Sequence, residues 1–141
     1  METMTQSITV QALVNAPVQK VWNSWNAPEH ITKWCYASDD WHAPKAENDI
    51  RTGGKFSTTM AAKDGSVSFD FGGVYSNVKP NALIEYAMED GRKVKIVFEA
   101  QGDKTRVTET FDAEGQHPIE MQRAGWQAIL DNFKKYTENL K

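Results

Sequence analysis

The sequence predicts an α+β fold in which a curved antiparallel sheet of seven strands packs against one long C-terminal helix. Three observations predict it. Turn signals recur about every ten residues between positions 46 and 111, as in an antiparallel meander. A single apolar stripe with helical spacing covers residues 118–140. An alternating pattern at residues 8–14 is followed by two short helical patterns, which would close one end of the sheet.

The N-terminal third begins with a half-buried strand, because apolar and polar residues alternate over positions 8–14. Pro17 then suits the first turn of a helix, and a second short helix begins at Pro28. Residues 35–45 are polar and are expected to form a loop. The two helices carry apolar residues at helical spacing: Val18, Val21, Trp22, Trp25, Ile31 and Trp34.

The middle of the chain predicts six strands separated by turns. Asp64-Gly65 marks a tight hairpin, since this dipeptide supplies the positive φ angles that such turns require. Gly72-Gly73 suggests a bulge or a sharp bend. The predicted strands cover residues 46–51, 56–62, 67–78, 84–88, 94–98 and 107–111.

The last segment predicts one helix of about 23 residues, which starts at His117-Pro118. Its apolar stripe would bury against the inner face of the sheet, and a strongly curved sheet leaves space beside a single helix. The stripe consists of Ile119, Trp126, Ile129, Phe133, Tyr136 and Leu140.

Composition narrows the class of protein. The 141 residues have about one domain's length, and 40% hydrophobic with 25% charged residues is typical of a folded globular chain. We therefore expect a single domain over residues 1–141. The net charge of −3 argues against a nucleic-acid-binding surface. A single cysteine, Cys35, excludes a disulfide framework within the chain.

The N-terminal residues lack the basic start and apolar run of a secretory signal. No apolar run approaches the roughly 20 residues that span a bilayer. We expect a cytoplasmic protein without a membrane span.

Several motifs resemble those of one superfamily. Residues 15–25 resemble the AP-x-x-VW-x-x-W opening of the START-like (SRPBCC) superfamily, and residues 49–56 are similar to its D-x-R-x-GG-x-F/Y block. Residues 105–108 and Gly125-Trp126 resemble later blocks. Together they are most similar to the activator-of-heat-shock-ATPase-homologue-like branch, over residues 8–139. The resemblance implies a helix-grip fold with an internal cavity, often for an apolar ligand, but such a fold hosts many functions.

Glu109 is the most informative candidate residue. It shares a strand face with Val107 and Phe111, so alternation points it inward, where the similar branch usually carries an apolar residue. A buried carboxyl group either has a raised pKa or finds a partner, such as Arg51, Arg123 or a ligand group. Two alternatives remain open: a local bulge that turns Glu109 to solvent, or an ordinary salt bridge.

The tryptophans cluster early in the chain. Trp22 is expected in the core, whereas Trp25 and Trp34 either fill the core or line the mouth of a cavity. Trp41 lies in the expected loop and is a candidate for a lid or a dimer contact.

The sequence contains no recognised motif for a metal site or for a catalytic nucleophile. Asp39, Asp40 and His42 lie near Cys35, but their spacing is no recognised zinc pattern. The chain has no Gly-x-Ser-x-Gly elbow. We expect no metal and no cofactor.

These observations predict a protein that binds a small apolar or amphipathic ligand, such as a lipid, in an internal cavity, with Glu109 as its polar anchor. The expected cavity lining, from the phase of strands and helix, is Trp25, Trp34, Phe56, Met60, Phe69, Phe71, Tyr86, Phe98, Glu109, Met121, Gly125 and Ile129.

Two other classes of function stay open. The resemblance to a chaperone activator suggests a co-chaperone-like interaction module with a chaperone partner. A cyclase- or hydrolase-type enzyme would use Glu109, the weak candidate for a catalytic residue, with a nearby tyrosine or arginine. An exposed Trp41 or an uncovered sheet edge would favour a homodimer.

Overall fold

The computed structural model describes residues 6–140. It contains seven strands and three helices in the predicted α+β order. Their bounds are β1 (Ser7–Val14), α1 (Val18–Asn26), α2 (Pro28–Trp34), β2 (Trp41–Asn48), β3 (Lys55–Ala62), β4 (Ser68–Lys79), β5 (Leu83–Met88), β6 (Lys93–Gln101), β7 (Lys104–Asp112) and α3 (Ile119–Asn139).

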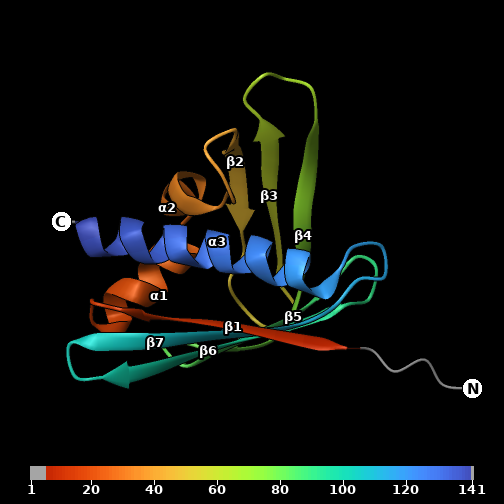
Figure 1. Cartoon of the computed structure of the whole chain (residues 1–141). Helices are drawn as coiled ribbons and strands as arrows, with labels where there is room; N and C mark the ends of the chain where they lie inside the picture. The colour runs from red at the N-terminus through yellow and green to blue at the C-terminus, as the bar shows by residue number, and fades with distance from the viewer. Residues whose placement is uncertain (1–5, 141) are drawn as a thin grey trace, which may run out of the picture.

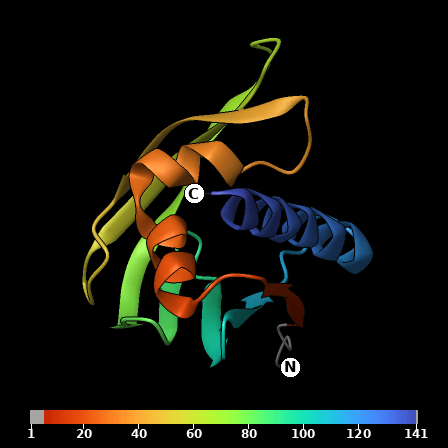
Figure 2. The ribbon, with the colours of Figure 1, turned by 90° about the vertical axis from the view of Figure 1, so that its left-hand side faces the viewer.

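The seven strands form one antiparallel sheet with the order β1-β7-β6-β5-β4-β3-β2. The two strands nearest the N-terminus, β1 and β2, therefore occupy opposite edges. Figure 2 shows the sheet curling around α3, with α1 and α2 beside the C-terminal end of that helix. The predicted helix-grip architecture, a curved sheet around a long C-terminal helix, is confirmed.

The helix α3 packs along one half of the sheet. It lies against β1, whereas β2, β3 and β4 rise away from it (Figure 1). The contact is apolar and close: the rings of Trp126 on α3 and Phe111 on β7 stack with centroids 3.8 Å apart. Leu130 and Phe133 of the same helix are fully buried. Burial of this apolar surface is the main source of stability for the helix–sheet contact.

The alternation of buried and exposed residues along β1, β6 and β7 forms the face of the sheet that packs against α3. On β1 the residues Ile8, Val10 and Val14 are buried while their neighbours are exposed or half-buried. The next two strands repeat the pattern, so their inner faces form a continuous surface. That continuity fixes which side chains of β6 and β7 point toward α3.

The helices α1 and α2 close one end of the curl with aromatic side chains. Trp22 is buried and meets Phe98 edge-on at 5.2 Å, so its predicted place in the core is confirmed. Trp25 and Trp34 lie 4.9 Å apart, and both pack edge-on against Phe133. The indole Nε1 of Trp34 donates to the carbonyl oxygen of residue 24 at 3.0 Å, which locks the two short helices together.

The prediction of a loop over residues 35–45 followed by a strand over 46–51 is wrong in its boundaries. The strand β2 begins at Trp41, which pairs with Ala62 of β3, and it ends at Asn48. A polar segment containing Pro44 reads as a loop, but an edge strand tolerates proline. Pairing with β3 therefore outweighs local propensity here.

The predicted bulge at Gly72-Gly73 is also displaced. The pairing with β3 runs unbroken through both glycines, and the register of β4 shifts between Tyr75 and Asn77. The glycines serve a different purpose, because a Cβ on Gly73 would lie 2.5 Å from the carbonyl oxygen of Ala87. Close approach of the neighbouring backbone requires glycine at this position.

Within residues 6–140, the structure contains no helix of the length and apolar character that crossing a membrane demands.

The Gly125→Ala substitution should stabilise the protein. Gly125 lies inside α3, and a Cβ there would meet no atom within 4 Å. A glycine inside a helix costs about 0.5–1 kcal/mol relative to alanine. We expect the free energy of unfolding in urea to rise by about that amount. Gly73→Ala is the contrasting variant and should lower it, and a loss of stability in Gly125→Ala would contradict the helix geometry.

Candidate functional site

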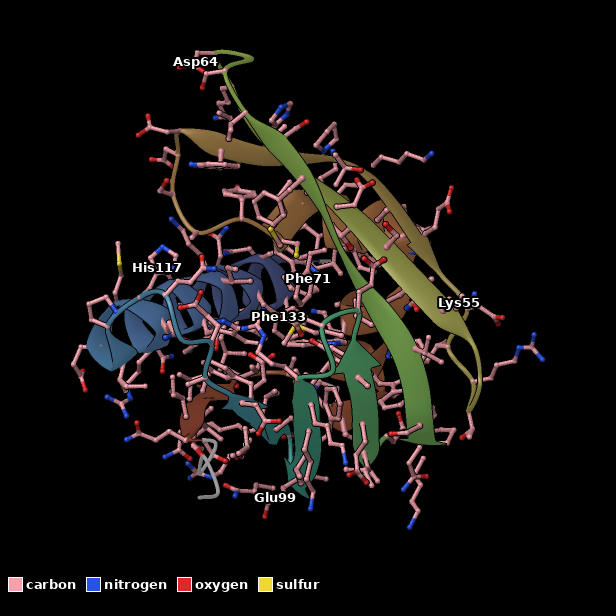
Figure 3. All side chains as sticks on the ribbon, turned by 90° about the vertical axis from the view of Figure 1, so that its right-hand side faces the viewer. Lys55, Asp64, Phe71, Glu99, His117 and Phe133 are labelled. Atoms are coloured by element: carbon pink, nitrogen blue, oxygen red, sulfur yellow. The ribbon has the colours of Figure 1, made fainter. Side chains whose placement is uncertain are left out.

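A cavity of about 270 Å³ lies between the sheet and α3. Figure 3 shows Phe71 of β4 and Phe133 of α3 in the interior, whereas Lys55, Asp64 and Glu99 lie at the periphery. Every helix and every strand except β1 contributes to the cavity wall. The lining residues are Trp25, Asn26, Ile31, Trp34, Cys35, Asn48, Phe56, Thr58, Met60, Phe69, Phe71, Tyr75, Ile84, Tyr86, Arg92, Ile96, Glu109, Trp126 and Ile129.

Most residues expected around a cavity do lie in its wall. They come from α1, α2, β3, β4, β5, β7 and α3, so the fold brings together segments that are far apart in the chain. These residues are Trp25, Trp34, Phe56, Met60, Phe69, Phe71, Tyr86, Glu109 and Ile129.

Phe98, Met121 and Gly125 do not line the cavity. Phe98 is buried beyond its end, where it packs edge-on against Trp22 and Trp25. Met121 is 62% exposed, whereas Gln122 in the same turn of α3 is buried, so Met121 lies on the outer face of the helix. Gly125 has open space beside it but no lining atom. Met121 lies five residues before Trp126, which is about 140° away around the helix, so helical phase places it off the apolar stripe.

Several lining residues were missing from the sequence-based set. Thr58 lies between Phe56 and Met60 in the alternation, so strand phase was a sufficient signal for it. Asn48 and Arg92 carry no such signal, because each lies at the end of a strand or in a turn. Their positions depend on how the sheet curls.

Glu109 points into the cavity and is 5% exposed. It pairs with Val10 of β1 and Ile96 of β6 in a register without interruption, so the alternative of a bulge that turns it to solvent is wrong. Among residues 6–140, no hydrogen bond or ion pair reaches its carboxyl group. The alternative of an ordinary salt bridge is therefore wrong as well.

The two arginines considered as partners are engaged elsewhere. Arg51 bonds to Asp49 at 2.9 Å on the surface, and Arg123 pairs with Glu120 one helical turn away. Both pairs join residues that are close in sequence, which costs little chain entropy. The inward carboxyl group of Glu109 thus has no cation from either arginine.

Burial raises the pKa of Glu109 to about 8, so the group is mostly protonated at neutral pH. Burial, with a smaller effect of Glu109, raises the pKa of the Cys35 thiol to about 12. The pKa of Tyr86 also lies well above its usual value, because of burial first and of Glu109, Tyr75 and Cys35 next. Glu109 therefore disfavours the ionised forms of Cys35 and Tyr86, whereas burial alone raises its own pKa.

Three more polar groups face the cavity without a hydrogen-bond partner in the described part of the chain. They are the hydroxyl groups of Thr58 and Tyr86 and the thiol of Cys35, and all three residues are buried. Together with Glu109, they offer several hydrogen-bonding positions to an occupant.

A chain of hydrogen bonds fixes another part of the cavity wall. The Tyr75 hydroxyl donates to Asn48 Oδ1 at 2.5 Å, and Asn48 Nδ2 donates to the Asn26 carbonyl oxygen at 2.8 Å. Asn26 Nδ2 continues to the carbonyl oxygen of Trp22 at 3.0 Å. The network ties β4, β2 and α1 together, so these polar side chains have structural partners that Glu109 lacks.

Arg92 is the basic residue of the lining. Its Nε lies 2.7 Å from Asp90 Oδ2, and its side chain is 27% exposed. The guanidinium charge is therefore balanced at the margin of the cavity, where solvent also reaches it.

The loop residues weighed for a metal do not assemble a site. Asp39, Asp40 and His42 are exposed, and residues 6–140 hold no group of three histidine, cysteine or acidic side chains placed to share an ion. Trp41 is half-buried, and its ring centroid lies 5.9 Å from that of Phe69. It pairs with Ala62, the last residue of β3 before the β3–β4 turn.

Comparison with known proteins gives one family and many similar folds. The family model described as Activator of Hsp90 ATPase homolog 1-like protein matches residues 15–138. The solved AHSA1-like protein of Aeromonas hydrophila is 44% identical, with a TM-score of 0.89 over 94% of this chain and 92% of that chain. A protein of Cytophaga hutchinsonii is 61% identical, with a TM-score of 0.82 over the same shares.

A more distant protein of Chromobacterium violaceum is 21% identical at a TM-score of 0.83, over 95% of this chain and 98% of that chain, which shows a common fold alone. A search of curated proteins gave no match.

Glu109 should make stability depend on pH. Because its pKa is raised from 4.5 to about 8, the folded protein keeps a proton that the unfolded chain releases in this interval. The contribution is fully present below about pH 4.5 and is lost as the pH rises through about 8, on the order of a few kcal/mol. Urea unfolding at several pH values should show this decline in the wild type and a much weaker one in Glu109→Gln.

The matched control for this experiment is Glu99→Gln, an exposed carboxyl group on the adjacent strand β6. It should keep the pH dependence of the wild type. An equal decline in the wild type and in Glu109→Gln would contradict the burial of an unpaired carboxyl group.

Proposed function

This chain belongs to the family of Activator of Hsp90 ATPase homolog 1-like proteins, and we propose that it binds a small, largely apolar molecule in the cavity between the sheet and α3. Membership of this family confirms the START-like branch that the sequence motifs predicted. The family relationship supports the fold, and the proposal about binding depends on the chemistry of the cavity.

The observation that carries the proposal is a pocket of about 270 Å³ between the sheet and α3 whose wall is mostly apolar. Apolar side chains around such a pocket gain dispersion contacts from an apolar molecule that fits between them. Here the space is lined largely by aromatic and aliphatic side chains, with a few convergent polar groups, which is the usual composition of a ligand pocket.

The cavity's size restricts the ligand. Its volume of about 270 Å³ lies just below the roughly 300–1,000 Å³ that is typical of ligand pockets. The ligand is therefore a compact molecule, such as a fused aromatic ring or a short acyl chain, rather than a two-chain lipid. Glu109 would orient it, since a carboxyl group without a protein partner is available to hydrogen-bond a polar end.

A second candidate function is a co-chaperone-like interaction, which the match to the family of an Hsp90 ATPase activator favours. Under this hypothesis the protein would bind a chaperone ATPase of its own cell and raise its rate of hydrolysis. We expect co-purification with that chaperone and a stimulated ATPase rate, measured with and without the protein. An unchanged rate at saturating protein, together with no co-purification, would remove this candidate.

Partly filling the cavity should weaken ligand binding. With naphthylmethanol as a neutral apolar probe, we expect saturable binding to the wild type in calorimetry. Ile129→Phe places a larger side chain in the cavity and should weaken that binding at least about tenfold, which corresponds to about 1.4 kcal/mol.

Met121→Phe adds an aromatic ring to the same helix at an exposed position outside the cavity, and it should bind like the wild type. NMR spectra of both variants check that they are folded. Absence of saturable binding to the wild type, or equal binding to Ile129→Phe and Met121→Phe, would refute the proposed site.

A further inference from the structure

Glu109 is a carboxyl group in an aromatic cavity with no cation from the protein beside it. From this arrangement we infer that the natural ligand is an apolar amine, whose ammonium group pairs with the Glu109 carboxylate inside the cavity. The inference rests on the proposed function and adds the chemical class of the ligand.

The surroundings of Glu109 among residues 6–140 provide no free cation to balance its negative charge when the carboxyl group is ionised. Its strand neighbours Val10 and Ile96 are 2% and 1% exposed, so an ionised carboxylate there is poorly hydrated. Of the lining residues, Arg92 alone is basic, and its Nε is bound to Asp90 at 2.7 Å. An ionised Glu109 would be a buried charge without a partner, which is the costly state, and a ligand ammonium group would supply that partner.

The aromatic lining favours the same sign of charge. Aromatic rings carry negative potential on their faces and attract ammonium groups, with the strongest effect for tryptophan. Rings from three strands and three helices surround the space: Trp25, Trp34, Phe56, Phe69, Phe71, Tyr75, Tyr86 and Trp126. The same rings would disfavour a carboxylate or a phosphate ligand.

The ionisable groups that share the cavity with Glu109 come from four places in the fold. Cys35 follows α2, Tyr75 and Tyr86 lie on β4 and β5, and Arg92 precedes β6. The pKa values of the thiol and of both phenols are raised, mainly by burial, so these groups are neutral near pH 7. The helices α1 and α3 and the strand β3 contribute no ionisable side chain to the lining.

Amine binding should release a proton. Without ligand, Glu109 is mostly protonated at neutral pH because burial raises its pKa to about 8. Pairing with an ammonium ion requires the carboxylate, so the carboxyl proton leaves to solvent on binding. Linkage then predicts that amine affinity rises about tenfold per pH unit up to about pH 8, whereas the affinity for a neutral isostere stays constant.

Three probes of the same ring isomer test the inference: naphthylmethylamine, naphthylmethanol and naphthoate. For the wild type near pH 8, calorimetry should give an amine affinity at least about tenfold above that of the alcohol, and the weakest affinity for naphthoate. In Glu109→Gln the amine should fall to the level of the alcohol, while alcohol binding changes less than about threefold. Glu99→Gln, on the outer part of β6, should match the wild type with all three probes.

The outcomes separate the two levels of the proposal. If the alcohol does not bind the wild type, both the proposed function and the amine inference fail. If the alcohol binds but the amine binds no more tightly, or if Glu109→Gln keeps the preference for amine, the amine inference alone fails.

If naphthoate binds more tightly than the amine and the alcohol, Arg92 rather than Glu109 holds the polar end of the ligand, and the inference is overturned. The pH dependence is a second measurement on the wild type, so the inference can be tested even if Glu109→Gln does not fold. An amine affinity that is flat between about pH 6 and pH 8 would also overturn it.

Discussion

The structure depends on one packing constraint: a single helix cannot fill the inside of a seven-stranded sheet that curls around it. The helix α3 lies against β1 and stacks Trp126 on Phe111 of β7, and this contact holds it on one half of the sheet. The other half, β2 to β4, rises away from it (Figure 1). Side chains from both halves reach into the gap without closing it, so the cavity follows directly from where the helix is held.

The helices α1 and α2 make this open arrangement stable. Their tryptophans cover the end of the curl, where Trp25 and Trp34 both pack on Phe133 of α3. The Asn48–Asn26 hydrogen bond connects the far edge of the sheet to α1, so the edge strand β2 is held although it lies away from α3. These contacts hold the side chains of the cavity wall in place, as a binding site for a small molecule requires.

Glu109 departs from the chemistry of its surroundings. The unbroken pairing of β7 with β1 and β6 directs the Glu109 side chain inward. Burial disfavours the ionised carboxylate there, which is why the pKa of Glu109 is raised. Proteins commonly accept such a local cost at a functional site, where the compensating interaction comes from a ligand. The solved proteins of Aeromonas hydrophila and Cytophaga hutchinsonii share the fold of this chain at high TM-scores. A shared fold alone does not explain why a carboxyl group without a partner lies in the core.

The sequence by itself determined the α+β class, the strands of the meander, the long helix and the inward direction of Glu109, because all of these follow from local periodicity. The tertiary structure decided the rest. It placed the start of β2 at Trp41 through pairing with β3, moved Phe98 and Met121 out of the cavity wall, and brought Arg92 into it. The start of β2 and the positions of Phe98 and Arg92 depend on strand pairing and on the curvature of the sheet, which are set by contacts between segments far apart in the chain and leave no periodic trace in the sequence.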